Sequence, residues 1–265
     1  MSELGNHRAR KRFGQNFLVD EGIIDRIIAA VNPKPGDNLV EIGPGQGALT
    51  GRLLAANPSL VAIELDRDLV QLLAAHYAHE PGFKLIESDA LKVDFSELAG
   101  PGPLRVVGNL PYNISTPLIF HLLDYQTVIH DMHFMLQREV VERMAATPGS
   151  KTYGRLSIMV QYLCRVDLLF LVPPESFAPA PKVESAIVRL TPRNSRSVSA
   201  ANPKLFEQLV AMSFQQRRKT LRNNLKPFAS RYTLDNLNID LGRRPETLSV
   251  DEFVDLSNQL NAQHA

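Results

Sequence analysis

The sequence predicts an α/β protein, in which a doubly wound, mostly parallel sheet of seven strands, the last one antiparallel, precedes a small all-helical domain. Three observations support this prediction. Short apolar runs alternate with helical patterns from residue 20 to residue 190, as expected for βαβ units. Only residues 173–184 separate the last two apolar runs, too few for a crossover helix, so these strands should pair antiparallel. Beyond residue 194 only helical spacing remains.

The individual elements are predicted in order along the chain. The first helix starts at its cap, Asp20, and ends at Val31, before Pro33 and Pro35, because a helix interior cannot accommodate proline. Strands are expected at residues 38–42, 60–65, 84–87, 104–108, 132–136, 168–172 and 185–190. Helices are expected between them at residues 48–56, 68–79, 117–123, 139–146 and 156–164.

A polar segment of small residues, 194–202, marks the predicted domain boundary. Residues 1–194 should form the larger domain, with residues 1–12 as a mobile basic arm. Residues 195–265 should form the helical domain, since Phe206, Leu209 and Val210 fall at helical spacing.

The composition excludes several classes of protein. Of 265 residues, 44% are hydrophobic and 22% charged, which is typical of a soluble globular protein. A single cysteine, Cys164, rules out an intrachain disulfide and a cysteine zinc cluster. No apolar run approaches the roughly 18 residues of a membrane span, and the basic start lacks the apolar stretch of a secretory signal. The histidines show no ligand spacing. We therefore expect a cytoplasmic protein without a metal or a membrane partner.

The net charge of +1 hides a local asymmetry. No acidic residue occurs between Glu207 and Asp235, whereas this window holds six cations, namely Arg217, Arg218, Lys219, Arg222, Lys226 and Arg231. With the basic N-terminal arm, this makes two positive patches that suit a polyanion such as nucleic acid. The alternative is a solvated helix face.

A glycine-rich loop follows the first strand and predicts a nucleotide-type ligand. Gly43 and Gly45 let the backbone turn sharply and approach a ligand closely. Glu64 ends the next strand, 21 positions after Gly43, where a carboxylate can accept ribose hydroxyls. Asp89 ends the strand after that and could accept an adenine amine. Taken singly, each acid is more simply a helix cap or a solvated strand end.

Two ligands fit this loop. Gly43, Gly45 and Ala48 also satisfy the dinucleotide fingerprint, so a nicotinamide-dependent oxidoreductase is the competing hypothesis. Glu41 immediately before the loop would repel a pyrophosphate but suits the ammonium group of a methionine-type ligand. The pattern therefore favours S-adenosylmethionine.

The predicted reaction centre is Asn109-Leu110-Pro111-Tyr112, which follows the strand at 104–108. The Asn109 side-chain oxygen and the Leu110 carbonyl, held by Pro111, can accept the hydrogens of a planar amine, and Tyr112 can stack on its base. The alternative is a plain turn. Its place beside the glycine loop favours the functional interpretation, because ligands bind at the carboxyl ends of such strands.

A second aromatic residue, Phe177, precedes a proline-rich loop and could grip the other face of the base. Such a clamp would require an unstacked or flipped nucleotide. The alternative is that Phe177 fills a hydrophobic gap.

Several motifs now occur together and in order. They are residues 11–18, 43–47, 109–115, 137–140, 153–157, 177–185 and 216–225. With them, nearly the whole chain resembles the ribosomal RNA adenine N6,N6-dimethyltransferase family. It is most similar to the bacterial small-subunit branch, which acts on 16S rRNA and is linked to kasugamycin resistance.

The resemblance implies a class I (Rossmann-like) S-adenosylmethionine-dependent methyltransferase fold. Its activity would convert two adjacent adenosines in a hairpin near the 3′ end of 16S rRNA to N6,N6-dimethyladenosine during small-subunit biogenesis. The expected partner is 16S rRNA in a small-subunit precursor, bound by a monomer. The family's cofactor contacts fall on Asn16, Leu18, Gly43, Glu64, Asp89 and Asn109. RNA contacts are expected at Arg217, Arg218, Lys219 and Arg222.

A third hypothesis is an RNA-binding assembly factor that has kept the fold and lost catalysis. The presence of Glu64, Asp89, Asn109 and Tyr112 argues against it, because a protein that only binds RNA would not need them.

Overall fold

The computed structural model describes residues 15–193, 199–216 and 218–264. The chain divides into two compact units. The first comprises Met1–Val141 and Asp167–Pro192, and the second comprises Glu142–Val166 and Arg193–Ala265. The predicted basic arm and most of the predicted linker lie outside the described residues. The second unit also takes in residues 142–166, which the predicted boundary at 194 had assigned to the first domain.

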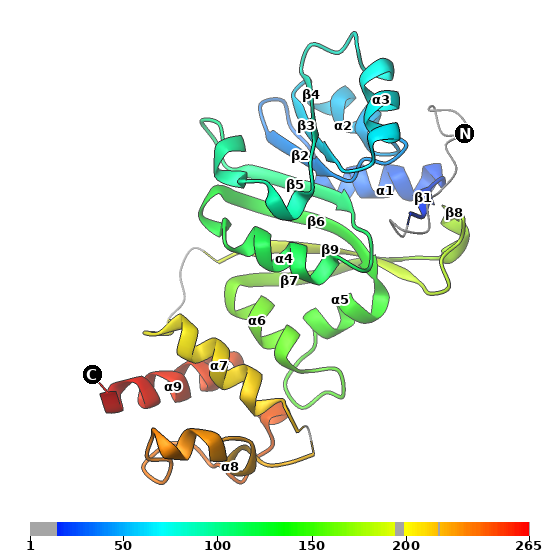
Figure 1. The fold of residues 1–265 in the computed structure, drawn as a ribbon. Helices are drawn as coiled ribbons and strands as arrows, with labels where there is room; N and C mark the ends of the chain where they lie inside the picture. Colours follow the sequence, from blue (N-terminus) through cyan, green and yellow to red (C-terminus); the bar gives the residue numbers. More distant parts are fainter. Residues whose placement is uncertain (1–14, 194–198, 217, 265) are drawn as a thin grey trace. The chain divides into compact units, whose positions relative to one another are not determined.

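The first unit is built on one seven-stranded sheet (Figure 1). In spatial order its strands are β4 (Phe83–Glu87), β3 (Leu60–Glu64), β2 (Asn38–Ile42), β5 (Leu104–Asn109), β6 (Ile129–Gln137), β9 (Ser185–Pro192) and β7 (Cys164–Val172). The first five strands in this order, from β4 through β3, β2 and β5 to β6, pair in parallel with their neighbours. Strand β9 pairs antiparallel with β6. This confirms the predicted fold class.

Helices cover both faces of this sheet, with α1 on one face and α4 on the other (Figure 1). The helices between the strands are α1 (Glu21–Val31), α2 (Thr50–Ala56), α3 (Arg67–His76), α4 (Ser115–Leu123) and α5 (Arg138–Met144). Short 3₁₀ helices are η2 (Ala90–Lys92), η3 (Phe95–Leu98), η4 (Gln126–Val128) and η5 (Pro174–Ser176). Two strands of two residues, β1 (Phe17–Leu18) and β8 (Phe177–Ala178), form a separate small sheet.

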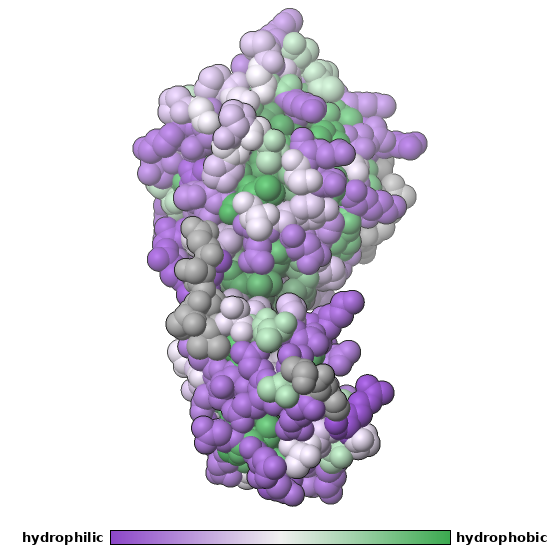
Figure 2. All heavy atoms as spheres, turned by 90° about the vertical axis from the view of Figure 1, so that its left-hand side faces the viewer, coloured by the Kyte–Doolittle hydropathy of each residue, from purple (hydrophilic) through white to green (hydrophobic). Residues whose placement is uncertain are grey.

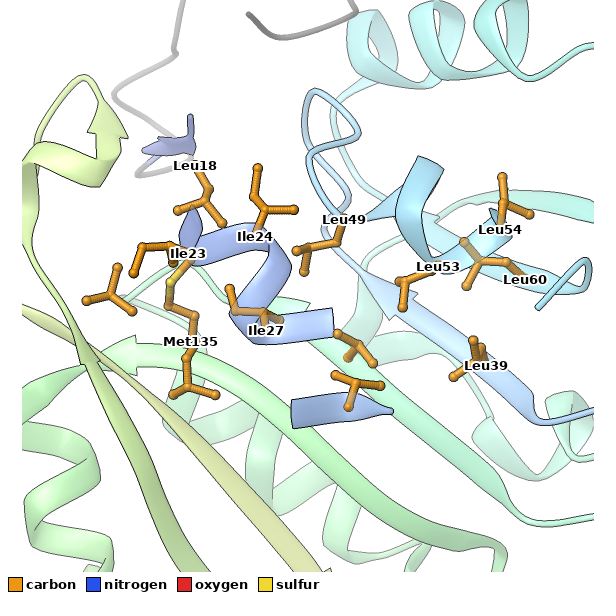
Figure 3. Packing of buried hydrophobic residues seen from close by; sticks show 14 of the residues in the cluster. Leu18, Ile23, Ile24, Ile27, Leu39, Leu49, Leu53, Leu54, Leu60 and Met135 are labelled. Atoms are coloured by element: carbon orange, nitrogen blue, oxygen red, sulfur yellow. The ribbon is translucent and has the colours of Figure 1, made fainter. Parts of the chain in front are cut away.

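Helix α1 shows how the sequence fixes one layer of the core. Asp20 caps it by accepting a hydrogen bond from the Ile23 amide at 3.1 Å. The helix ends at Val31, and its C-cap, Asn32, has a left-handed φ of 48° directly before Pro33. Its buried side chains are Ile23, Ile24, Ile27 and Val31. In Figure 3 three of them, Ile23, Ile24 and Ile27, lie among Met135, Leu49 and Leu53, so the helix joins the sheet to the segment after the glycine loop.

The second unit is helical around its own core. Its helices are α6 (Arg155–Leu163), α7 (Pro203–Ser213), α8 (Leu221–Asn224) and α9 (Val250–Asn261), with 3₁₀ helices η6 (Lys226–Ser230), η7 (Pro245–Thr247) and η8 (Ala262–His264). The residues at helical spacing, Phe206, Leu209 and Val210 among them, are buried in one cluster. Among the described residues after Pro192, no strand occurs.

Several element bounds differ from the sequence prediction, among them the start of β6 at Ile129 instead of residue 132 and the end of α3 at His76 instead of residue 79. Strand β7 begins at Cys164 rather than at residue 168, and α6 ends at Leu163.

Hydrophilic side chains cover most of the face drawn in Figure 2. None of the helices in the described ranges is long and apolar enough to cross a membrane.

Candidate active site

A cavity of about 310 Å³ opens at the carboxyl ends of β2, β3 and β5. This is the edge at which parallel α/β sheets bind ligands. The predicted site residues that line it are Asn16, Leu18, Gly43, Gly45, Glu64, Asp89, Asn109, Leu110, Pro111 and Tyr112. Residues that are far apart in the chain thus meet around one space.

The glycine loop makes the floor of the cavity and depends on its glycines. Gly43 and Gly45 have φ values of 66° and 59°, in the left-handed region that side chains with a Cβ rarely adopt. A Cβ on Gly45 would also lie 3.3 Å from the Phe17 ring. The Gly43 amide donates to the Ile63 carbonyl at 2.9 Å, which holds the loop against the end of β3.

Glu64 and Asp89 both line the cavity and also cap local backbone. One Glu64 carboxylate oxygen accepts from the Gly45 amide at 3.2 Å, and the other accepts from the Leu65 and Asp66 amides at 2.9 Å each. Asp89 accepts from the Leu91 amide at 3.0 Å. Each acid therefore does cap nearby backbone amides, as the simpler interpretation of the sequence expected. These hydrogen bonds also fix both carboxylates at the cavity wall.

Glu41 is a third carboxylate at the cavity and is almost completely buried. Its carboxylate accepts a hydrogen bond from the Thr50 hydroxyl at 2.7 Å. Burial, opposed by the Thr50 hydrogen bond and reinforced by the charge of Glu64, raises the pKa of Glu41 to about 7. Burial also raises the pKa of Glu64. Two desolvated carboxylates in one cavity favour a ligand that carries positive charge.

Asn109 ends β5, which packs closely against the strand that carries the glycine loop. A Cβ on Gly108 would lie 2.6 Å from the Ile42 carbonyl oxygen, so this close approach requires glycine. The Asn109 side-chain amide donates to the Asn16 carbonyl at 3.1 Å. Because the Asn16 carbonyl can only accept, the amide atom facing it is the NH₂ group. The Asn109 side-chain oxygen therefore points the other way and is available as an acceptor. The Leu110 amide donates to the Met135 carbonyl at 3.2 Å.

Tyr112 lies half-buried at the cavity. Its hydroxyl is 2.7 Å from the Ser185 hydroxyl on β9. A phenol is already neutral near pH 7, and burial raises the pKa of Tyr112 further. The turn holds the backbone of Tyr112, since the Ser115 hydroxyl donates to its carbonyl at 3.2 Å.

Comparisons with known proteins identify the family. The profile of the ribosomal RNA adenine dimethylase family matches residues 6–262. The chain belongs to this family. A protein named ribosomal RNA small subunit methyltransferase A from Saccharophagus degradans is 60% identical over 96% of this chain and 95% of its own length. One of the same name from Pseudomonas aeruginosa is 59% identical over 98% and 97%.

Solved structures agree with this family. A dimethyladenosine transferase from Plasmodium falciparum is 28% identical, with a TM-score of 0.79, and the match covers 94% of this chain and 98% of that one. The 23S rRNA methyltransferase ErmE, at 24% identity and a TM-score of 0.73 over 93% and 100% of the two chains, shares the fold. The chain is thus an S-adenosylmethionine-dependent methyltransferase of the ribosomal RNA adenine dimethylase family, and the oxidoreductase hypothesis is wrong.

The cavity residues fit this methyl donor. S-adenosylmethionine carries an ammonium and a sulfonium group, which suits the two desolvated carboxylates Glu41 and Glu64. Glu64 ends β3, and Asp89 lies two residues after the end of the neighbouring strand β4, so a nucleoside can lie across both. Among the described residues, no group of histidine, cysteine, aspartate and glutamate side chains is arranged to hold a metal ion.

The N-terminal segment completes the cavity in a way that residue patterns did not reveal. Strand β1 pairs antiparallel with β8, so that Leu18 lies opposite Phe177. The Asp20 carboxylate accepts from the Ser176 hydroxyl at 3.1 Å, next to this pair. Asn16 and Leu18 were placed at the site only by the family resemblance, because two-residue strands carry no periodicity.

Phe177 is the one predicted catalytic residue that the structure does not bring to the cavity wall. Its side chain is 5% exposed and packs in the hydrophobic cluster with Leu18, Met135 and Ile187. In this structure Phe177 therefore fills a hydrophobic gap, as the alternative to the base clamp expected.

The predicted RNA contacts belong to the second unit. Arg218 and Lys219 are exposed, whereas Arg222 forms an exposed ion pair with Asp235 at 2.9 Å. Arg217 lies outside the described residues.

Proposed function

We propose that the protein dimethylates N6 of two adjacent adenosines in a hairpin near the 3′ end of 16S rRNA, within a precursor of the small ribosomal subunit. Two relatives of 59–60% identity bear the name ribosomal RNA small subunit methyltransferase A, which supports the small subunit as the substrate. The enzyme would act as a monomer in the cytoplasm, where bacterial ribosomes assemble. Residues 1–194 would carry catalysis and residues 195–265 would contact RNA.

One observation carries this proposal: Asn109, Leu110 and Tyr112 line the same cavity as the acids that suit the methyl donor. When bound, S-adenosylmethionine supplies an electrophilic methyl carbon. The adenine amine is a weak nucleophile, because its lone pair is delocalised into the ring. The Asn109 side-chain oxygen and the Leu110 carbonyl would accept the two amine hydrogens and turn the lone pair out of the ring plane. Positioning of this kind supplies most of the rate in a direct displacement.

Tyr112 would be the platform on which the target base stacks. Its half-buried side chain lines the cavity, and its neutral phenol adds no charge beside the base. Phe177 would cover the other face only if its side chain left the hydrophobic cluster. Gripping a base in this way requires a flipped nucleotide.

The decisive experiment is mass-spectrometric mapping of methyl groups on small-subunit RNA. Unmethylated small subunits would be incubated with the protein and an isotope-labelled methyl donor. We expect four labelled methyl groups on two adjacent adenosines near the 3′ end. Labelling elsewhere would reject the proposed substrate, and binding to the particle without any labelling would favour the assembly-factor hypothesis.

The Asn109→Ala variant tests the assigned chemistry in the same assay. We expect turnover to fall by roughly 10²-fold or more, as when a preorganised hydrogen-bonding group is lost. Cofactor affinity, measured by calorimetry, should stay within a few-fold. Asn238→Ala, at an exposed position of the second unit, is the matched control and should behave as the wild type. Near-normal turnover of Asn109→Ala would remove Asn109 from the reaction.

A further inference from the structure

The Tyr112 ring is held at its far end by a residue from a distant part of the chain. Its hydroxyl lies 2.7 Å from the hydroxyl of Ser185, 73 positions later in the sequence. Ser185 is completely buried, whereas Tyr112 is half-buried and lines the cavity. The serine therefore anchors the aromatic ring from beneath, on the side away from solvent.

The position of Ser185 is fixed by the sheet. Ser185 is the first residue of β9 and pairs with Gln137 of β6. The same strand, β6, pairs with Asn109 through Met135. Strand β6 therefore sets the relative positions of the predicted amine acceptor and of the serine that anchors the ring.

A second pair of contacts keeps the start of β9 on β6. The Arg138 amide donates to the Glu184 carbonyl at 2.9 Å, and the Arg138 guanidinium pairs with the Glu184 carboxylate at 2.7 Å. Glu184 immediately precedes Ser185. The contacts between Arg138 and Glu184 therefore hold the backbone at Ser185 in place without any contribution from Tyr112.

The turn already fixes the Tyr112 backbone. The Ser115 hydroxyl donates to the Tyr112 carbonyl, and the Ile114 amide donates to the Pro111 carbonyl at 3.2 Å. What remains free is rotation of the ring about its two side-chain torsions. The phenol oxygen lies on the long axis of the ring, so the Ser185 hydrogen bond restricts the first torsion, which aims this axis, and not rotation about the axis itself. The hydrogen bond is made by the Ser185 side chain alone, so it adds nothing to the strand pairing.

We propose that Ser185 is a positioning residue for methyl transfer, whose buried hydroxyl fixes the direction in which the Tyr112 side chain points and thereby the position of the target adenine stacked on it. This proposal rests on the proposed role of Tyr112 as the stacking platform. Methyl transfer requires the amine nitrogen to lie in line with the methyl carbon, and a misplacement of about 1 Å is enough to slow such reactions strongly. A ring that swings away about its first torsion would carry the stacked base with it and move that nitrogen.

The test is a double-mutant cycle with Ser185→Ala and Tyr112→Phe. Each single variant removes one partner of the same hydrogen bond and should lower kcat by roughly two- to tenfold, the size expected for one hydrogen bond. If Ser185 acts through Tyr112, the double variant should be no slower than Tyr112→Phe alone. Cofactor affinity should be unchanged in all three, because neither hydroxyl belongs to the glycine loop or its acids.

A second measurement reports on the base directly. A small-subunit RNA with 2-aminopurine in place of one target adenosine should lose fluorescence when the base stacks on Tyr112. Ser185→Ala should leave this fluorescence less quenched than the wild type does. Ser213→Ala is the matched control, since Ser213 is also fully buried but bonds the Leu209 carbonyl within α7. It should leave both the turnover and the quenching normal.

The outcomes separate this proposal from the proposed function. Normal turnover of Ser185→Ala, or effects of the two single variants that multiply in the double variant, would overturn the positioning role. Tyr112→Ala distinguishes the remaining case. If Tyr112→Ala methylates and quenches normally, the stacking platform itself is wrong. If Tyr112→Ala is severely impaired while Ser185→Ala is normal, only the role of Ser185 fails.

Discussion

At the scale of single residues, Glu41 is an acid whose protonation is governed by burial. It is buried at the end of β2, its carboxylate accepts from the Thr50 hydroxyl, and burial raises its pKa to about 7. Such a carboxyl group is largely protonated below neutral pH in the unliganded fold. Its ionised form needs a nearby cation, and the family's cofactor brings one. Glu41 therefore links the stability of the unliganded protein to pH.

The sign of this link follows from the direction of the shift. The pKa rises from 4.5 to about 7 on folding, so the folded state retains a proton that the unfolded chain has lost. Stability is greatest below pH 4.5 for this group and falls as the pH rises to about 7. The shift corresponds to roughly 3 kcal/mol.

We therefore expect Glu41→Gln to stabilise the unliganded protein above pH 7. Glutamine can still accept from Thr50 and has no charge to desolvate. The free energy of unfolding in urea, measured at pH 5 and pH 8, should rise in the variant relative to the wild type by roughly 2–3 kcal/mol more at pH 8 than at pH 5. The exposed Glu139 on α5 provides the control Glu139→Gln, which should show no such pH dependence. An equal effect of Glu41→Gln at both pH values would contradict the assigned shift.

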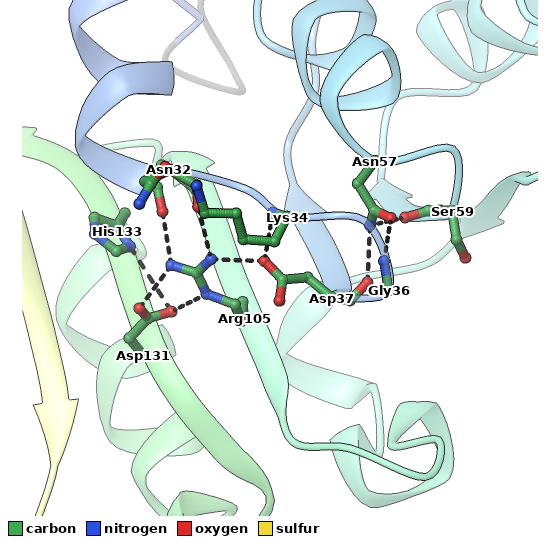
Figure 4. Close-up of polar contacts among 10 residues, drawn as sticks. Asn32, Lys34, Gly36, Asp37, Asn57, Ser59, Arg105, Asp131 and His133 are labelled. Carbon is green, nitrogen blue, oxygen red and sulfur yellow. Dashed lines mark hydrogen bonds and ion pairs between the residues drawn. The ribbon is translucent and has the colours of Figure 1, made fainter.

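At the scale of elements, Arg105 joins four segments at the amino ends of the strands (Figure 4). From β5 it forms ion pairs with Asp37 before β2 and Asp131 on β6, at 2.7 and 2.9 Å. It also donates to the Val31 carbonyl at 2.7 Å, one of the last carbonyls of α1, which have no partner within the helix. Next to Asp131, burial lowers the pKa of His133 to about 4, so the imidazole is neutral.

Replacing Arg105 by Met should destabilise the first unit by roughly 2–4 kcal/mol, because it leaves Asp131 buried and the end of α1 unsatisfied. Chemical denaturation measures this loss. Arg67→Met is the control, since Arg67 pairs with Glu87 on the surface and should cost less than about 1 kcal/mol. Cofactor affinity should not change, because Arg105 lies at the end of β5 opposite Asn109. A loss no larger than that of Arg67→Met would show that the network contributes little.

The large sheet could be predicted because buried parallel strands form continuous apolar runs. The acids at 64 and 89 could be predicted because they end such runs. The pairing of β1 with β8 could not, since a strand of two residues has no period and its partner lies far along the chain. The start of β7 at Cys164 was missed because Arg165 and Asp167 interrupt its first residues, and the apolar run becomes continuous only from Leu168. The burial of Phe177 depends on neighbours from several elements, which its local sequence does not contain.

At the scale of the whole molecule, the predicted catalytic residues and the basic cluster at 218–219 belong to different units. The acids and the amine site belong to the first unit, whereas Arg218 and Lys219 belong to the second. The net charge of only +1 means that long-range attraction to RNA cannot come from the protein as a whole. It must come from local clusters of cations. The second unit would then supply binding that does not depend on the bound methyl donor.

The double variant Arg218→Gln, Lys219→Gln tests this division. Removing one cation that binds a phosphate should reduce the slope of log affinity against log salt by about 1, so the slope should fall by up to about 2. Affinity for the small-subunit particle, measured by filter binding from low to high salt, should therefore drop most at low salt. Cofactor affinity should remain unchanged. Lys84→Gln, Lys204→Gln removes the same charge from exposed positions on β4 and α7, and we expect its salt slope to match the wild type. Equal changes in the two double variants would mean that total charge, and not the cluster at 218–219, determines RNA affinity.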